Sequence, residues 1–174
     1  MRIDLRDPLA TPVVPAGIEL RAFDLERDAR VIHATLTEAF TDHWGFSLPS
    51  FDRLVHEYLE GTSSGFDAGL WFVAVEGDEV VGAVCGRERL ALAPDTGHVE
   101  VLGVRDGWRG HGFGRALLFT AFGELKRRGV AKAELGVDAE SETGATRLYQ
   151  GVGMRTFRAA EFWEKALPPD PGRR

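Results

Sequence analysis

The segment that decides the fold lies in the second half of the chain, at residues 99–118, VEVLGVRDGWRGHGFGRALL. Apolar residues alternate with other residues up to Val104, which predicts a strand, and the apolar positions at the far end recur at helical spacing. Between these two patterns, Gly110, Gly112 and Gly114 alternate with larger residues. The segment therefore predicts a strand, a glycine-rich turn and a helix in direct succession.

This turn has the properties of an anion-binding site. Glycine has no Cβ, so the backbone can take unusual angles and a ligand can approach it closely. The free N–H groups of the turn and of the first helical turn point at one spot, where the helix dipole also favours negative charge. Arg109 and Arg115 flank the glycines and can add charge-assisted bonds to phosphate. Residues 109–115 therefore predict a ligand that carries a pyrophosphate.

Four interpretations of the turn compete. A dinucleotide-binding motif has its third glycine one position later and belongs to an early βαβ unit, whereas this turn lies late in the chain. A triphosphate-binding loop requires Lys and then Ser or Thr after its last glycine, and Arg115 and Ala116 stand there instead. Coenzyme A carries a pyrophosphate that fits without a metal. In the fourth interpretation, the glycines only form a tight connection between strand and helix.

Outward from this segment, the hydrophobic patterns predict one domain with a mixed α/β sheet of about six strands and four helices. The expected strands are residues 18–23, 70–76, 79–87, 97–105, 130–138 and 154–163. The expected helices are residues 26–40, 50–59, 113–128 and 142–150. The expected division is a proline-rich irregular lead-in at 1–17, the domain at 18–167 and a disordered tail at 168–174.

The composition argues against several classes of protein. The 174 residues, 44% of them hydrophobic, suit one globular domain. The net charge of −6 argues against a nucleic-acid-binding protein, although it would attract a cationic substrate. No apolar run is long enough to span a membrane, and prolines interrupt the apolar stretch near the N-terminus, so neither a membrane protein nor a signal peptide is expected. A cytoplasmic location follows by default.

Cysteine and histidine usage predicts neither a disulfide nor a metal site. Cys85 is the only cysteine, and its place in a predicted strand favours a small buried hydrophobe over a catalytic thiol. His33, His43 and His56 have no metal-ligand spacing relative to each other or to the cysteine, so no metal is expected.

The turn and its surroundings resemble the GCN5-related N-acetyltransferase (GNAT) family. The coenzyme A loop of that family reads Arg or Gln, two residues, Gly, one residue, then Gly or Ala, and residues 109–114 (RGHGFG) match it. The order of the elements from Ile18 to Trp163 also matches, so the resemblance covers nearly the whole chain. Within the family, residues 137–149 are most similar to actinobacterial single-domain members that resemble one half of tandem mycothiol synthase-type proteins.

The resemblance implies that acetyl-coenzyme A (acetyl-CoA) is the cosubstrate and that two central parallel strands splay apart to receive its pantetheine arm. The arm and the thioester carbonyl would lie against Leu102, Gly103 and Val104. The pyrophosphate would bind in the loop formed by Arg109, Gly110, His111, Gly112, Phe113, Gly114 and Arg115.

Two positions depart from the family pattern. Asp106 stands where a Pro is common, which brings a negative charge near the expected phosphate site. Ser141 stands where many members have an Asn that contacts the pantetheine arm. A serine can still form this hydrogen bond, with less reach.

The reaction implied is direct attack of a neutral amine on the thioester, which needs a base for the amine and a proton donor for the thiolate. Tyr149 matches the family's tyrosine donor, and without the resemblance it would be interpreted as a core residue. Strand alternation would put Glu100 and His98 on one face with Leu102 and Val104. Family members have a catalytic Glu at either position, so Glu100 and His98 both stay candidates for the base, as does a structural role for each.

The acceptor is the least defined part of the prediction. Asp42, His43, Trp44 and Phe46 fall where family members build the acceptor pocket, although aromatic residues there can equally be core. The resemblance implies a small-molecule or peptide amine as acceptor, and family members often form homodimers. Two alternatives to catalysis are a coenzyme A-binding sensor of the same fold and an interaction protein that uses the glycine loop only as a turn.

Overall fold

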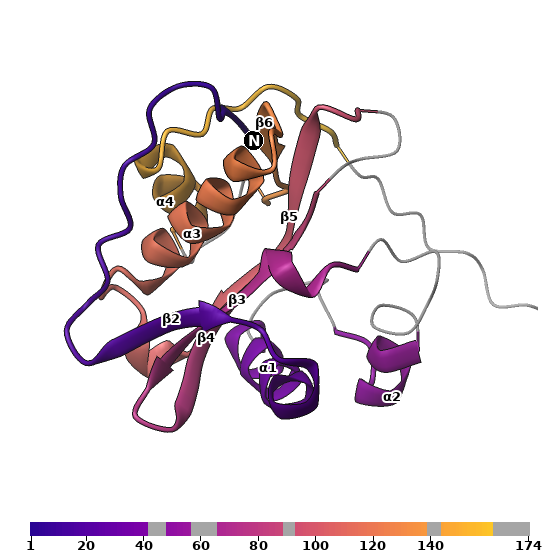
Figure 1. Ribbon diagram of the computed structural model, residues 1–174. Coiled ribbons are helices and arrows are strands. Elements are labelled where there is room, and N and C mark those ends of the chain that lie inside the picture. Colours follow the sequence, from indigo (N-terminus) through magenta and orange to yellow (C-terminus); the bar gives the residue numbers. More distant parts are fainter. Residues whose placement is uncertain (42–47, 57–65, 89–92, 139–143, 162–174) are drawn as a thin grey trace, which may run out of the picture.

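The computed structural model describes residues 1–41, 48–56, 66–88, 93–138 and 144–161. Its centre is a six-stranded sheet with the strand order β1-β6-β5-β4-β3-β2 (Figure 1). The strands are β1 (Arg2–Asp4), β2 (Ile18–Ala22), β3 (Trp71–Glu76), β4 (Glu79–Arg87), β5 (Thr96–Val104) and β6 (Lys132–Glu134). Neighbouring strands are antiparallel except β5 and β6, which are parallel. The predicted mixed α/β sheet is confirmed.

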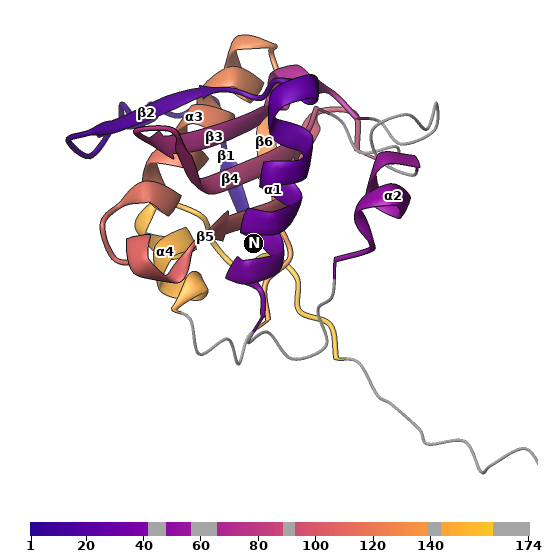
Figure 2. The same ribbon diagram turned by 90° about the horizontal axis from the view of Figure 1, so that it is seen from below.

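Helices cover both faces of this sheet. α1 (Leu25–Ala39) lies on one face, and α3 (Phe113–Arg127) lies with α4 (Ala145–Gly151) on the opposite face (Figure 1, Figure 2). The described residues also contain the short helix α2 (Phe51–Leu54) and the 3-10 turns η2 (Ala68–Leu70) and η3 (Asp106–Trp108). The four predicted helices are therefore present, and α2 is followed by residues outside the described ranges.

An apolar stripe holds each long helix on the sheet. α1 begins after the cap residue Asp24, whose side chain accepts a hydrogen bond from the Arg27 N–H at 2.9 Å, and it buries Ile32 and Leu36. The buried stripe of α3 joins the larger core cluster through Phe113, Leu117, Leu118, Phe122 and Leu125. The sheet is thus sandwiched between two separate apolar clusters, one under α1 and one under α3.

The structure corrects the prediction at one edge of the sheet. Residues 2–4, expected in an irregular lead-in, form β1, because Ile3 packs into the core and the strand pairs with β6. Residues 154–161, expected in a last strand, contain only an isolated bridge between Arg155 and Arg2. β1 therefore supplies the sixth strand in place of the C-terminal segment. The expected tail at 168–174 lies outside the described residues.

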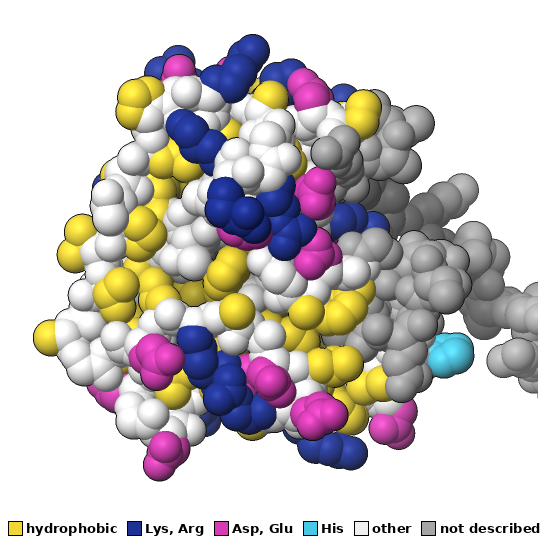
Figure 3. Space-filling model, in the orientation of Figure 1, with side chains coloured by type: hydrophobic (Ala, Val, Ile, Leu, Met, Phe, Trp, Pro, Cys, Tyr) yellow, Lys and Arg dark blue, Asp and Glu magenta, His cyan; other side chains and the backbone are white. Residues whose placement is uncertain are grey.

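Charges of both signs are interspersed on the face shown in Figure 3, where basic side chains lie beside acidic ones. Arg128, at the end of α3, forms ion pairs with Asp67, Glu88 and Glu124. These pairs tie the end of α3 to the segments before β3 and after β4. Within the ranges listed above, no helix is long and apolar enough to cross a membrane.

Asp28 is an almost fully buried charge at the start of α1, and its loss is expected to destabilise the fold. Its carboxylate accepts hydrogen bonds from both terminal nitrogens of Arg21, at 2.6 and 2.9 Å, and from the Asp24 N–H at 2.8 Å. Burial acts to raise the pKa of Asp28, but these hydrogen bonds outweigh it and hold the pKa below its ordinary value. Asp28→Asn should lower the free energy of unfolding in urea by about 2–3 kcal/mol at pH 7.

The effect of Asp28→Asn on the free energy of unfolding should depend on pH. Because the pKa of Asp28 is depressed in the folded state, its stabilisation is present above the ordinary aspartate pKa and is lost as the pH falls through the folded-state value. The gap in unfolding free energy between wild type and Asp28→Asn should therefore shrink below about pH 4. The control is Asp4→Asn, which breaks an exposed pair with Arg6 and should cost less. A larger loss in the control would contradict this account.

Candidate functional site

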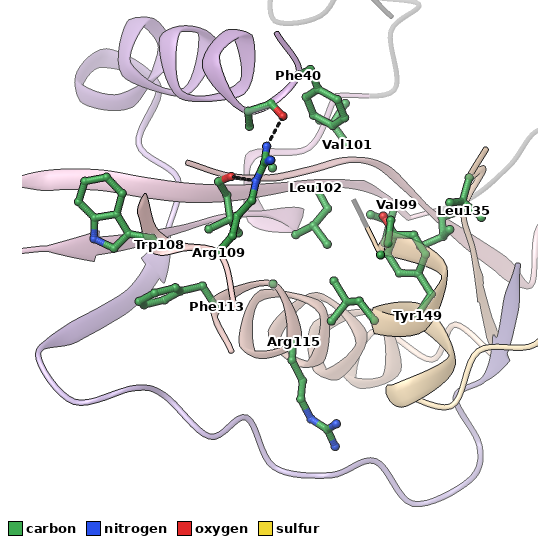
Figure 4. Close-up of a pocket in the computed structure, with 18 of the residues that line it drawn as sticks. Phe40, Val99, Val101, Leu102, Trp108, Arg109, Phe113, Arg115, Leu135 and Tyr149 are labelled. Carbon is green, nitrogen blue, oxygen red and sulfur yellow. Dashed lines mark hydrogen bonds between the residues drawn. The ribbon is translucent and has the colours of Figure 1, made fainter. Parts of the chain in front are cut away.

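A cleft of about 640 Å³ opens where β5 and β6 part (Figure 4). The two strands pair over only three positions, the last being His98 with Glu134. Beyond that point, residues 99–104 line one wall of the cleft and residues 135–138 line the other. The predicted splaying of the central parallel strands is therefore present, and it leaves the edge of β5 open toward the cleft.

The structure brings most of the predicted site residues together around this cleft. The lining residues among them are Glu100, Leu102, Gly103, Val104, Arg109, Gly110, Gly112, Phe113, Gly114, Arg115 and Tyr149. His98 and His111 are not among the lining residues. Ser141, Asp42, His43, Trp44 and Phe46 lie outside the described residues.

Several lining residues were not expected from the sequence. Residues 135–138 were assigned to a strand, but β6 ends at Glu134, so they face the cleft instead. Ala39 and Phe40 reach the cleft from the end of α1, which is far away in the chain. No local signal distinguishes these positions, because only the packing of α1 and the short length of β6 place them there.

The glycine-rich loop closes the cleft at the start of α3. Gly112 is the residue before the helix and has φ 91°, and Gly110 has φ 79°, so both occupy the left-handed region that favours glycine. No side chain caps the first amides of α3. The first N–H groups of a helix have no partner inside the helix, and the positive end of the helix dipole lies at the same place. The loop can therefore bind an anion through its backbone.

The two arginines that flank the loop do not direct their charges into it. The Arg109 guanidinium donates to the backbone oxygens of Val104 and Ala39, at 3.1 and 2.6 Å. Arg115 donates to the Gly151 oxygen at 3.1 Å, and Figure 4 shows its side chain extending away from the cleft. Both residues line the cleft, and in this structure backbone oxygens accept hydrogen bonds from their guanidinium groups, so their bonds to phosphate stay a prediction.

A bulge in β5 overturns the prediction that His98, Glu100, Leu102 and Val104 share one face. On β4, Cys85 pairs with Val101 and the next residue pairs with Val99, so Glu100 is an extra residue without an opposite partner. Leu102 and Val104 pack against the cluster under α3, whereas Val101 packs against the cluster under α1. An extra residue breaks the period of two, which is the physical reason for the error.

The candidate bases therefore have different surroundings. The Glu100 carboxylate forms an ion pair with Arg87 at 3.0 Å, and each side chain is 32% exposed. His98 has a buried Nδ1 that finds no hydrogen-bond partner among the described residues. Cys85, the alternative nucleophile, is buried, and its burial, with a smaller contribution from Glu100, raises the pKa of its thiol. The prediction that Cys85 is a small buried hydrophobe is confirmed.

Tyr149 projects from α4 into the cleft, at the end away from Trp108 (Figure 4). Its side chain is 9% exposed, and burial raises the pKa of the phenol above its ordinary value. The phenol therefore stays protonated at neutral pH, as a proton donor requires. Among the residues the structure describes, no group of His, Cys, Asp and Glu is arranged to hold a metal ion.

Gly103 lets the end of α1 approach β5, and a side chain there is expected to disturb the cleft. A Cβ on Gly103 would lie 2.6 Å from Leu36 Cδ2 and 3.1 Å from Ala39 Cβ. Gly103→Ala should lower the free energy of unfolding in urea by about 1–3 kcal/mol through overpacking. The control Gly123→Ala, on the exposed side of α3 with open space around it, should raise stability by about 0.5–1 kcal/mol. Equal effects of the same sign would refute the packing argument.

Comparison with known proteins gives a consistent result. A model of the Acetyltransferase (GNAT) family matches residues 32–154. The chain is 34% identical over 158 residues to a mycothiol acetyltransferase of Thermobispora bispora, covering 88% of this chain and 52% of that protein. It is 33% identical over 153 residues to a mycothiol acetyltransferase of Streptomyces scabiei, covering 87% of this chain and 47% of that protein. The chain thus spans about half the length of the curated relatives it matches.

Solved structures show the same fold. A GCN5-related N-acetyltransferase from Sphaerobacter thermophilus superposes with a TM-score of 0.74 at 38% identity, covering 88% of this chain and 46% of that one. The PaiA N-acetyltransferase from Thermoplasma acidophilum, in complex with coenzyme A, superposes with a TM-score of 0.61 at 18% identity, covering 77% of this chain and 87% of that one.

Proposed function

The chain belongs to the acetyltransferase (GNAT) family, and from this premise we propose that it transfers an acetyl group from acetyl-CoA to a primary amine. The observation that carries the proposal is the cleft between β5 and β6, which ends at the uncapped amides of the glycine-rich loop. An elongated thioester with a pyrophosphate at one end matches both features of this cleft.

Acetyl-CoA, the acetyl donor, is proposed to lie along the open edge of β5. Its arm runs beside Leu102, Gly103 and Val104 and can pair with the strand backbone there, because β6 does not cover this edge. Its pyrophosphate binds the amides of the loop at residues 110–114. The residues present fit such a ligand, since Gly110 and Gly112, both in the left-handed region, carry no side chain that would cover the loop backbone.

The chemistry proposed is direct transfer in a ternary complex. The neutral amine attacks the thioester carbonyl carbon, a C–N bond forms, the C–S bond breaks, and the amine loses a proton. We assign the proton acceptor to Glu100, directly or through a water, because Glu100 lines the cleft and His98 does not. Tyr149 donates a proton to the departing sulfur, and its raised pKa keeps that proton in place at neutral pH.

The acceptor is proposed to be a small-molecule or peptide amine. The net charge of −6 favours a cationic acceptor, because an acidic protein attracts positive charge over a distance. Amines related to mycothiol belong first in an acceptor panel, since the curated relatives carry that name.

The test is a panel of amine acceptors with acetyl-CoA, monitored by release of the free thiol. We expect turnover with at least one amine, and heat of binding with acetyl-CoA alone. Binding without turnover across the panel would favour a coenzyme A-binding sensor of the same fold. Absence of both binding heat and a thermal shift with acetyl-CoA would end the acetyltransferase proposal.

A further inference from the structure

The glycine-rich loop begins with an arginine whose three guanidinium nitrogens each contact an oxygen of the protein itself. The three guanidinium nitrogens of Arg109 contact the Val104 oxygen at 3.1 Å, the Ala39 oxygen at 2.6 Å and an Asp106 carboxylate oxygen at 2.9 Å. We infer that Arg109 is a positioning residue that joins the end of α1 to the end of β5, and that it does not bind the phosphates of the donor. The inference rests on the proposed function of the cleft.

The two carbonyl groups that Arg109 joins belong to the last residues of a helix and of a strand. Ala39 is the last residue of α1, and the last carbonyls of a helix have no partner within it. Val104 is the last residue of β5, at the rim of the cleft. The planar guanidinium fork presents donors in fixed directions, so it can hold both oxygens at once, which the single ammonium of lysine cannot reproduce.

Asp106 explains why this arginine adds little charge to the loop. Its carboxylate pairs with Arg109, and its backbone oxygen accepts the Arg109 N–H at 3.2 Å. The residue that departs from the family pattern therefore faces the arginine, and it offsets the positive charge of the guanidinium near the loop. The backbone amides of the loop are therefore the groups that bind the pyrophosphate of the ligand.

The consequence of this link is the shape of the cleft on the side where α1 meets β5. Ala39 and Phe40 line it from α1, and Gly103 lines it from β5 while its backbone packs against Ala39. Arg109 holds the end of α1 against β5, the strand beside which the thioester arm is proposed to lie. Without the link, the end of α1 can move away from β5, and a misplacement of about 1 Å can cost about a hundredfold in rate.

Two acetyl donors can distinguish a positioning role of Arg109 from a role in binding phosphate. Acetyl-CoA and acetyl-pantetheine carry the same thioester arm, but only acetyl-CoA carries phosphates. Arg109→Gln should reduce kcat/KM about 10–100-fold with both donors and by the same factor, so that the ratio between donors stays that of wild type. Arg109→Lys keeps the charge but should restore little of the lost kcat/KM, because lysine cannot bridge the two carbonyl groups.

The opposite pattern would overturn the inference. A loss confined to acetyl-CoA and restored by Arg109→Lys would make Arg109 a phosphate ligand. No loss with either donor would exclude a positioning role. The matched control is Arg105→Gln, which breaks surface pairs with Glu38 on α1 and Glu79 on β4 but leaves the Arg109 bond to Ala39 in place, and should change kcat/KM less than about threefold with either donor.

Stability and the proposed function are tested separately. Thermal melts identify the variants that are folded at the assay temperature, and if Arg109→Gln does not fold, Arg109→Lys carries the test alone. If wild type turns over no acceptor with either donor, the proposed function fails. The inference on Arg109 is then tested by calorimetry, where equal weakening of coenzyme A and pantetheine binding supports it and weakening of coenzyme A alone overturns it.

Discussion

Gly112→Asp is expected to weaken acetyl-CoA binding by about a thousandfold or more. Gly112 has φ 91°, and a side chain in this left-handed region costs about 1–2 kcal/mol. The new carboxylate would also lie beside the uncapped amides of α3, where it can accept their hydrogen bonds in place of the ligand's phosphates. Each hydrogen bond to a charged group contributes about 1.5–3 kcal/mol, so competition for two of them reaches the roughly 4 kcal/mol that a thousandfold change requires, whereas the strain acts on the free and the bound protein alike.

The measurement is titration calorimetry with acetyl-CoA, and the chain offers a matched control. Gly107 lies in η3, a few residues before the loop, where a Cβ would meet no atom within 4 Å and where φ is outside the left-handed region. Gly107→Asp adds the same charge at this exposed position and should weaken binding less than about threefold, because solvent screens it. Similar losses in both variants would show that overall charge, and not the loop backbone, governs binding.

Tyr149→Phe is expected to lower kcat by about a hundredfold or more with the best acceptor. General acid catalysis by a positioned side chain contributes about 10²–10⁴-fold, and the substitution removes only the hydroxyl. The ring is buried in the larger core cluster, and phenylalanine retains its packing there. The affinity for acetyl-CoA, measured by calorimetry, should therefore stay within about threefold of wild type, while single-turnover transfer slows.

The raised pKa of Tyr149 allows a second test of its role, through the dependence of kcat on pH. Burial favours the neutral phenol, so the donor form persists above the ordinary tyrosine pKa of about 10. The kcat profile of wild type should show no loss that belongs to Tyr149 below about pH 10. A variant Tyr149→Phe that retains most of the wild-type kcat would rule out proton donation by this residue.

Much of the site was predictable because its signals are local. The order strand, glycine-rich turn and helix follows from the alternation before Val104, the glycines at 110 and 112 and the apolar stripe of α3. The hairpin of β3 and β4 was likewise indicated by a two-residue turn at Gly77 and Asp78. These features depend on backbone freedom and side-chain periodicity within a short stretch of chain.

The errors concern residues whose environment comes from distant parts of the chain. The three residues of β1 are too few to show a period, and their pairing with β6 brings together segments more than a hundred positions apart, as the bond from Arg2 to Glu134 shows with a separation of 132. The residues after β6 were assigned to a strand because apolar residues continue there, and only the splay from β5 turns them toward the cleft.

The sequence by itself determined that a glycine-rich loop opens a long helix after a central strand, because backbone angles and helix periodicity are properties of neighbouring residues. The tertiary structure decided which way the side chains around that loop point. Glu100 leaves the face of Leu102 because of a mismatch with β4, and Arg109 turns to Ala39, 70 positions earlier in the chain. The pairing register of a strand and the hydrogen-bond partner of an arginine both depend on segments that packing brings close. Those segments lie far away in the chain, so the neighbouring residues carry no sign of them.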